Sequence, residues 1–192
     1  MKKLVFASNN PNKLKEIQDV LTNVEILSLK DINCFDELPE TQDTLEGNAF
    51  QKAQYVKDNF GYDCFADDTG LMVEALDGRP GVYSARYAGP DCSSEGNMDL
   101  LLKELSDKNN RKAKFSTVIA LVTDNEHQSF EGSVEGVILE EKSGKEGFGY
   151  DPVFRPESSN VSFAEMSKSD KNKISNRGRA LEKFSEYLKE QA

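Results

Sequence analysis

The chain has few of the residues that metal clusters, disulfide frameworks and histidine-based triads need. Its 192 residues include one histidine and three cysteines, and the cysteines are too far apart to form a CxxC pair or a Cys/His cluster. Zinc and a disulfide framework are therefore not expected. A Ser-His or Cys-His triad would have to use His127, which has no supporting residues nearby. If the chain is an enzyme, carboxylates and lysines are expected to carry the chemistry.

Long apolar runs are also absent. None approaches the roughly 20 residues of a membrane helix, and the run after Met1-Lys2-Lys3 is too short for a secretory signal. We therefore expect a cytoplasmic protein with no membrane partner. The length fits one domain, residues 1–192, and a composition of 37% hydrophobic and 30% charged residues is typical of a soluble globular protein.

The charge is strongly acidic overall but uneven along the chain. A net charge of −10 argues against a nucleic-acid partner, because such proteins usually present a basic face. Residues 31–48 contain acids and no base, whereas bases outnumber acids in residues 155–180. An acidic side suits a metal ion, and a basic side suits phosphates or a polar base. Two solvated faces would give the same pattern.

Apolar periodicity predicts an α/β fold with a mixed sheet. The early part of the chain alternates strands and helices, and the later part contains a hairpin of long, β-branched runs. Strands are expected at 2–8, 24–29 and 62–67, helices at 11–22, 44–59, 94–106 and 170–190, and the hairpin at 112–141.

The loop between the first strand and the first helix is rich in asparagine and contains a lysine. Its sequence, "SNNPNK", spans residues 8–13, where free backbone N–H groups and the helix dipole favour an anion. Because the glycines of a Walker loop are missing, an ordinary Asn/Pro turn that caps the helix remains an alternative. If the loop binds phosphate, Lys13→Ala should weaken triphosphate binding far more than it weakens the fold.

Two adjacent carboxylates, Asp67 and Asp68, follow the apolar strand at 62–67. Ligands of open α/β sheets gather at strand ends, and consecutive strand residues point to opposite faces, so one carboxylate can face a site while the other supports it. Carboxylate oxygens at such a position suit Mg²⁺. A simple Asp/Gly turn is the alternative.

Two later stretches have features of a nucleobase site. The glycines that flank Phe148 let the backbone approach a ligand closely, and an aromatic ring can stack on a base. Lys171 and Arg177 lie six residues apart in a basic stretch, and a helix break near Ser175 could bring both to one place. A turn with a core-facing phenylalanine and a solvated basic helix are the alternatives.

Together these stretches resemble the inosine triphosphate pyrophosphatase family, whose members hydrolyse non-standard purine nucleoside triphosphates. The resemblance runs in order along nearly the whole chain, and several motifs in register are specific although each is weak alone. The motifs are Ser8-x-Asn10-x-x-Lys13-x-x-Glu16, Glu40-Thr41, Glu46-Gly47-Asn48-Ala49, "ADDTGL", "PGVYSARYAG", "GFGYDPVF" and "SNRGRAL".

The resemblance implies an elongated mixed sheet flanked by helices, with two lobes and a central active-site cleft, and a homodimer. It implies a Mg²⁺-dependent enzyme that converts ITP, dITP and XTP to the monophosphate and pyrophosphate. Glu40 and Asp68 would hold the metal, and Asp68 would also be the base for the attacking water. The triphosphate would contact Ser8, Asn9, Asn10, Pro11, Asn12 and Lys13, and the rest of the substrate would contact Thr69, Phe148, Gly149, Tyr150, Asp151, Lys171, Asn176 and Arg177, with Phe148 stacking on the base.

One position departs from the family pattern, which usually has Ser-His-Arg where this chain has Ser175-Asn176-Arg177. An asparagine amide can donate to a purine 6-keto oxygen but cannot carry charge, so the preference among ITP, dITP and XTP stays open. Two other classes of protein also stay open. One is a receiver- or phosphatase-like domain in which Asp68 is phosphorylated, and the other is a module that binds nucleotides without turnover.

Overall fold

The computed structural model describes all 192 residues, and the chain forms two compact units. The chain passes from one unit to the other at several points, so neither unit is a single continuous segment. Two units match the two predicted lobes, while the single domain over 1–192 and the cleft stay predictions. Unit 1 comprises Met1–Asp68, Thr117–Glu131 and Ala180–Ala192, and unit 2 comprises Thr69–Ser116 and Gly132–Arg179.

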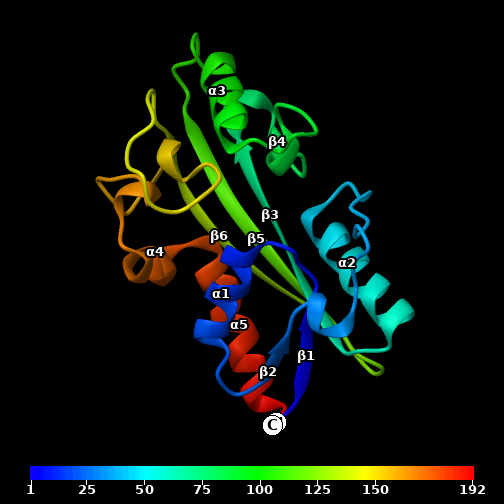
Figure 1. The fold of residues 1–192 in the computed structure, drawn as a ribbon. Coiled ribbons are helices and arrows are strands. Elements are labelled where there is room, and N and C mark those ends of the chain that lie inside the picture. The colour runs from blue at the N-terminus through cyan, green and yellow to red at the C-terminus, as the bar shows by residue number, and fades with distance from the viewer. The chain divides into compact units, whose positions relative to one another are not determined.

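Seven strands form one mixed sheet in the order β2-β1-β3-β5-β6-β7, with β4 paired to β3. β1 is parallel to β2 and β3, whereas β3–β4 and β6–β7 are antiparallel. This α/β architecture, drawn in Figure 1, confirms the predicted fold class. The strands are β1 (Lys3–Phe6), β2 (Glu25–Leu27), β3 (Cys64–Val73), β4 (Pro80–Gly81), β5 (Lys112–Val122), β6 (His127–Ile138) and β7 (Phe154–Pro156).

Five α-helices flank the sheet, and short 3₁₀ turns punctuate the loops. No helix is long and apolar enough to cross a membrane. The α-helices are α1 (Pro11–Val20), α2 (Leu45–Phe60), α3 (Ser94–Glu104), α4 (Lys168–Ile174) and α5 (Asn176–Glu190), and the 3₁₀ turns are η1 (Lys30–Ile32), η2 (Glu74–Leu76), η3 (Ser84–Arg86), η4 (Asp151–Val153) and η5 (Phe163–Glu165).

In unit 1, alternate residues of β1 are buried on opposite faces of the sheet. Leu4 and Phe6 pack in one apolar cluster with residues of α1 and α5, and Val5 packs in another with residues of α2. Figure 1 shows α1 and α5 together on one side of β1 and α2 on the other. Because helices cover both faces, β1 has the continuous apolar sequence that a doubly covered strand requires.

In unit 2, one face of the sheet is buried under α3 and the loops around Phe163. Leu101 of α3, Phe115 of β5 and Phe154 of β7 belong to one apolar cluster. The rings of Phe115 and Phe154 meet edge to face with centroids 4.7 Å apart, a geometry that aromatic pairs prefer. This core gives rigid support to the loop that carries Phe148.

The third predicted strand, 62–67, was given the wrong end. β3 continues through Asp67 and Asp68 to Val73, so the two carboxylates lie within a strand and do not begin a turn. β3 pairs with β1 at Cys64 and Phe65 and with β4 at Leu71 and Met72. Pairing with neighbouring strands therefore overrides the local turn signal of the polar residues.

Candidate active site

The opening loop, residues 8–13, is held mainly by its own side chains. The Asn10 carbonyl Oδ1 accepts hydrogen bonds from the backbone N–H groups of Asn12 (3.0 Å) and Lys13 (3.4 Å), and Pro11 begins α1. The hydroxyl oxygen of Ser8 accepts from the Asn10 N–H at 3.1 Å. The capping interpretation is therefore correct for Asn10. A phosphate would have to rely on the lysine side chain and the exposed loop amides.

Lys13 contacts the first of the two predicted carboxylates. Its ammonium Nζ lies 3.0 Å from Oδ1 of Asp67, whose side chain is 1% exposed. The supporting role that strand alternation predicted for one member of the acidic pair thus falls on Asp67. Because Asp67 is buried, its charge depends on this lysine.

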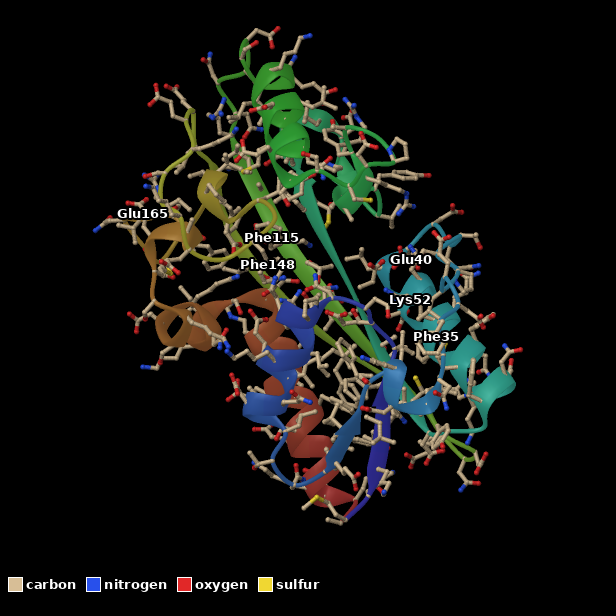
Figure 2. All side chains as sticks on the ribbon, in the orientation of Figure 1. Phe35, Glu40, Lys52, Phe115, Phe148 and Glu165 are labelled. Atoms are coloured by element: carbon tan, nitrogen blue, oxygen red, sulfur yellow. The ribbon has the colours of Figure 1, made fainter.

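Asp68, Glu40 and Lys52 meet beside α2, and sequence reasoning missed the lysine. The Lys52 ammonium Nζ lies 2.6 Å from Glu40 Oε1 and 3.9 Å from Asp68 Oδ1, and it donates to the Asp67 backbone carbonyl at 2.7 Å. Figure 2 shows Glu40 and Lys52 side by side. The available signal was a lysine on the apolar stripe of α2, next to Ala53 and at helical spacing from Ala49. We call Lys13, Glu40, Lys52, Asp67 and Asp68 the carboxylate–lysine set.

Burial raises the pKa of Asp68 to about 6, and the carboxylates of Glu40 and Asp67 add to that rise while Lys52 and Lys13 oppose it. The pKa of Lys52 is also raised, because the attraction of the Asp68, Glu40 and Asp67 carboxylates exceeds the opposing effect of burial. Asp68 therefore titrates near neutral pH, as a general base should.

A divalent cation fits this set. The Asp68 oxygen Oδ2 is buried without a hydrogen-bond partner, and such an oxygen is costly unless a ligand satisfies it. The protein has no group of three or more His, Cys, Asp or Glu residues arranged to hold a metal. One or two carboxylates are nevertheless enough for Mg²⁺, which takes its other ligands from water and substrate phosphates.

A second set of residues surrounds Phe148 in unit 2. The predicted helix break is present, because α4 ends at Ile174 and Ser175 precedes α5. The Lys171 ammonium lies 4.6 Å and the Arg177 guanidinium 5.3 Å from the centroid of the Phe148 ring. Two cations six residues apart thus meet at one aromatic ring, which favours the functional interpretation of this segment over a solvated basic helix.

Ser175 and Gly178 make this break possible. The Ser175 hydroxyl accepts a hydrogen bond from the Gly178 N–H at 3.0 Å, which caps α5. A Cβ on Gly178 would lie 1.9 Å from the Asn172 backbone carbonyl oxygen in α4. The "SNRG" sequence therefore combines a cap with the one residue that permits such a close approach.

Asp151 supports the Phe148 loop from within. Its Oδ2 accepts from the Phe148 backbone N–H at 2.9 Å and from the Lys171 ammonium at 2.6 Å. The side chain is 7% exposed, so its carboxylate is directed at protein groups. We call Thr69, Phe148, Asp151, Lys171 and Arg177 the aromatic–cation set.

The remaining predicted substrate residues are placed differently from one another. Tyr150 lies in the unit 2 core, where its hydroxyl donates to the Ser84 carbonyl at 2.6 Å, so only its backbone is available to a ligand. Arg177 Nη2 donates to Thr69 Oγ1 at 3.5 Å. Asn176 is buried at the start of α5, and Gly149 has a positive φ of 62°.

Gly147→Ala should disturb this loop more than Gly149→Ala does. Both glycines have a positive φ, of 75° and 62°, so both substitutions strain the backbone by about 1 kcal/mol or more. A Cβ at 147 would also lie 2.1 Å from Asp151 Oδ2, whereas one at 149 meets open space. We expect Gly147→Ala to lower both the thermal midpoint and the affinity for purine nucleotides beyond the matched Gly149→Ala variant. Equal melting and binding curves for the two would contradict the role given to Asp151.

A mixed α/β fold that carries buried carboxylates with lysines and an aromatic ring with cations is typical of a nucleotide-binding protein. Comparison with known proteins agrees. The model of the Ham1 family matches residues 4–187, and the chain belongs to this family. The family that its motifs resemble is thereby confirmed.

The relatives extend over nearly the full chain. The dITP/XTP pyrophosphatase of Flavobacterium johnsoniae is 54% identical over 187 residues, which cover 97% of each chain. The dITP/XTP pyrophosphatase of Porphyromonas gingivalis is 52% identical over 190 residues, which cover 98% of each. Among solved structures, the Ham1 protein of Staphylococcus aureus is 35% identical, with a TM-score of 0.93 and 100% of both chains covered.

Proposed function

We propose that this protein is a nucleoside triphosphate pyrophosphatase that hydrolyses the non-standard purine nucleotides ITP, dITP and XTP to the monophosphate and pyrophosphate. Such an enzyme removes these nucleotides from the cytoplasmic pool. The names of its relatives support the activity, and they favour a hydrolase over a phosphorylated receiver-like domain or a sensor without turnover. The observation that carries the proposal is the buried, unpartnered Oδ2 of Asp68.

The carboxylate–lysine set would act on the triphosphate. With its pKa raised to about 6, Asp68 is ionised at pH 7.5 yet basic enough to take a proton from the attacking water. Lys13, with the exposed side chains of the opening loop, would bind phosphate oxygens. Glu40 and Asp68 would hold Mg²⁺, which when bound supplies positive charge to the phosphates.

The aromatic–cation set would bind the base. Phe148 offers a ring on which a purine can stack, and Lys171 and Arg177 offer donors that suit a 6-keto oxygen. Adenine presents a 6-amino donor at that position, so these buried donors would be left unpaired, at a cost of about 1–3 kcal/mol. Asp68 and Thr69 are consecutive residues of β3 and belong to one set each, which is consistent with a single substrate for both.

Pyrophosphate release from ITP, dITP, XTP, GTP and ATP with Mg²⁺ tests this function directly. We expect kcat/KM for ITP and XTP to exceed that for ATP by roughly tenfold or more, the factor that one unpaired donor predicts. Turnover of GTP as fast as ITP would contradict the proposed selectivity, and unchanged ITP after long incubation would contradict the activity.

We also propose that the enzyme is a homodimer that associates through the open sheet face of unit 2. This face contains a hollow of about 770 Å³ around Met72 and Val137. Three acids and three bases line it, and none of the six has an ion-pair partner within the chain. A neutral patch with unpaired charges of both signs can pair with itself about a two-fold axis. The six residues are Glu74, Glu135, Glu157, Lys112, Lys114 and Arg155.

Light scattering on a sizing column should give twice the mass of the chain. Replacing both Lys114 and Arg155 with glutamate makes the patch strongly acidic, and we expect that variant to elute as a monomer. Lys2→Glu is the control, because it changes the charge of the chain at an exposed residue in unit 1. A charge-reversed variant that remained dimeric would exclude this face.

A further inference from the structure

We propose that Lys52 is a built-in counter-ion that holds the carboxylates of the metal site while no metal is bound, and that divalent cations therefore bind tightly only together with the nucleotide. The inference rests on the proposed function and concerns how its metal site is controlled. It assigns to Lys52 a positioning role that is separate from the proton transfer at Asp68.

The geometry places one ammonium at both carboxylates assigned to the metal. Lys52 Nζ lies 2.6 Å from Glu40 Oε1 and 3.9 Å from Asp68 Oδ1, and a third contact joins it to the Asp67 carbonyl at 2.7 Å. Its side chain is only 9% exposed, so water screens these charges weakly. The ammonium thus neutralises the carboxylates on which a metal would depend.

A divalent cation at Glu40 and Asp68 would meet this charge as a repulsion. Either Lys52 must leave the carboxylates or the cation must tolerate a like charge close by, and both weaken metal binding to the free protein. A triphosphate changes that balance because it brings several negative charges, which give Lys52 new partners and add oxygen ligands for the cation. Nucleotide and metal should therefore each increase the affinity for the other.

Lys57 provides a matched comparison on the same helix. Its ammonium also contacts two carboxylates, those of Asp63 and Asp124, each at 2.8 Å. These partners are 29% and 80% exposed, and neither is assigned to a metal. Removing the charge of Lys57 changes α2 in the same way without altering the charge at Asp68.

Mn²⁺ binding measured by electron paramagnetic resonance at pH 8 tests the proposal. The samples are the wild type, Lys52→Met and Lys57→Met, each without nucleotide and with an ITP analogue whose α,β bridge is methylene. Without nucleotide, we expect Lys52→Met to bind Mn²⁺ on the order of tenfold or more tightly than the wild type, because a buried like charge is removed. Lys57→Met should match the wild type. The analogue should tighten Mn²⁺ binding strongly in the wild type and much less in Lys52→Met.

Mn²⁺ affinity in Lys52→Met equal to or weaker than in the wild type would overturn the proposal, as would an unchanged effect of the analogue. Lys52→Gln, which can still donate to Glu40 and the Asp67 carbonyl, replaces the methionine variant if that protein does not fold. A wild type that released no pyrophosphate from ITP would contradict the proposed function, whereas the Mn²⁺ affinities without nucleotide would still decide the role of Lys52.

Discussion

Asp68→Asn is expected to abolish pyrophosphate release and, in the metal-free protein at pH 8, to stabilise the fold. The loss of activity should be roughly 10²–10⁴-fold, which is the usual contribution of a general base, and is larger if metal binding fails as well. The gain in stability follows from the environment of the carboxylate. Asp68 Oδ2 is buried without a partner, and the neutral amide removes a buried negative charge.

The pH dependence has a definite sign. The pKa of Asp68 is raised from 3.8 to about 6 in the folded protein, so the folded state binds the proton more tightly than the unfolded state. Its contribution to stability is complete below pH 3.8 and is lost as the pH rises through 6. At pH 8 the ionised carboxylate costs up to about 3 kcal/mol, and Asp68→Asn avoids that cost.

Urea unfolding in EDTA at pH 4 and pH 8 measures this difference. The advantage of the variant should be present at pH 8 and nearly absent at pH 4. Asp63→Asn is the control, because Asp63 is a partly exposed carboxylate paired with Lys57, and its loss should leave activity unchanged and slightly lower stability. An Asp68→Asn protein that was active, or less stable than the wild type at pH 8, would contradict these assignments.

Lys13→Ala is expected to damage both binding and the fold. The sequence led us to expect mainly a loss of triphosphate affinity, but Lys13 Nζ lies 3.0 Å from the carboxylate of Asp67, which is 1% exposed. Removing one partner of a buried ion pair leaves the other uncompensated, at a cost of about 3 kcal/mol or more. The free energy of unfolding should fall by that amount, and KM for ITP should rise at least roughly tenfold.

A double mutant separates the two effects. Lys13→Ala with Asp67→Asn leaves no buried charge, so it should recover most of the lost stability while KM for ITP stays high. Denaturation curves and steady-state kinetics on the same preparations measure both. If the double mutant recovered the KM as well, Lys13 would act on the substrate only through Asp67.

Local signals predicted the elements and the ends of several helices. Thr44 was expected to cap α2, and its hydroxyl accepts from the Gly47 N–H at 2.9 Å. The capping box of Ser162 and Glu165 is also present, although it begins the 3₁₀ turn η5. The break at Ser175 could be anticipated because serine caps helices and glycine follows three residues later. All of these depend on residues within one turn of each other.

Features that depend on distant residues were harder to predict. β3 passes through the polar Asp67 and Asp68 because strands on either side of it in the sheet supply its hydrogen bonds. Lys52 resembled a helix residue with a solvated ammonium until the fold brought Glu40 to it. Tyr150, expected to contact the substrate, is held in the core by a hydrogen bond to Ser84, 66 residues away in the chain.

The junction of α4 and α5 restricts how this protein can change its preference for a base. Ser175 and Gly178 are fixed by the cap and by the close approach to the Asn172 carbonyl, and Lys171 and Arg177 depend on that junction for their place at Phe148. Between the serine and the arginine, position 176 alone can vary without moving either cation. Changes in base selection along a lineage, or in the laboratory, therefore have one inexpensive route, and this chain already has asparagine there.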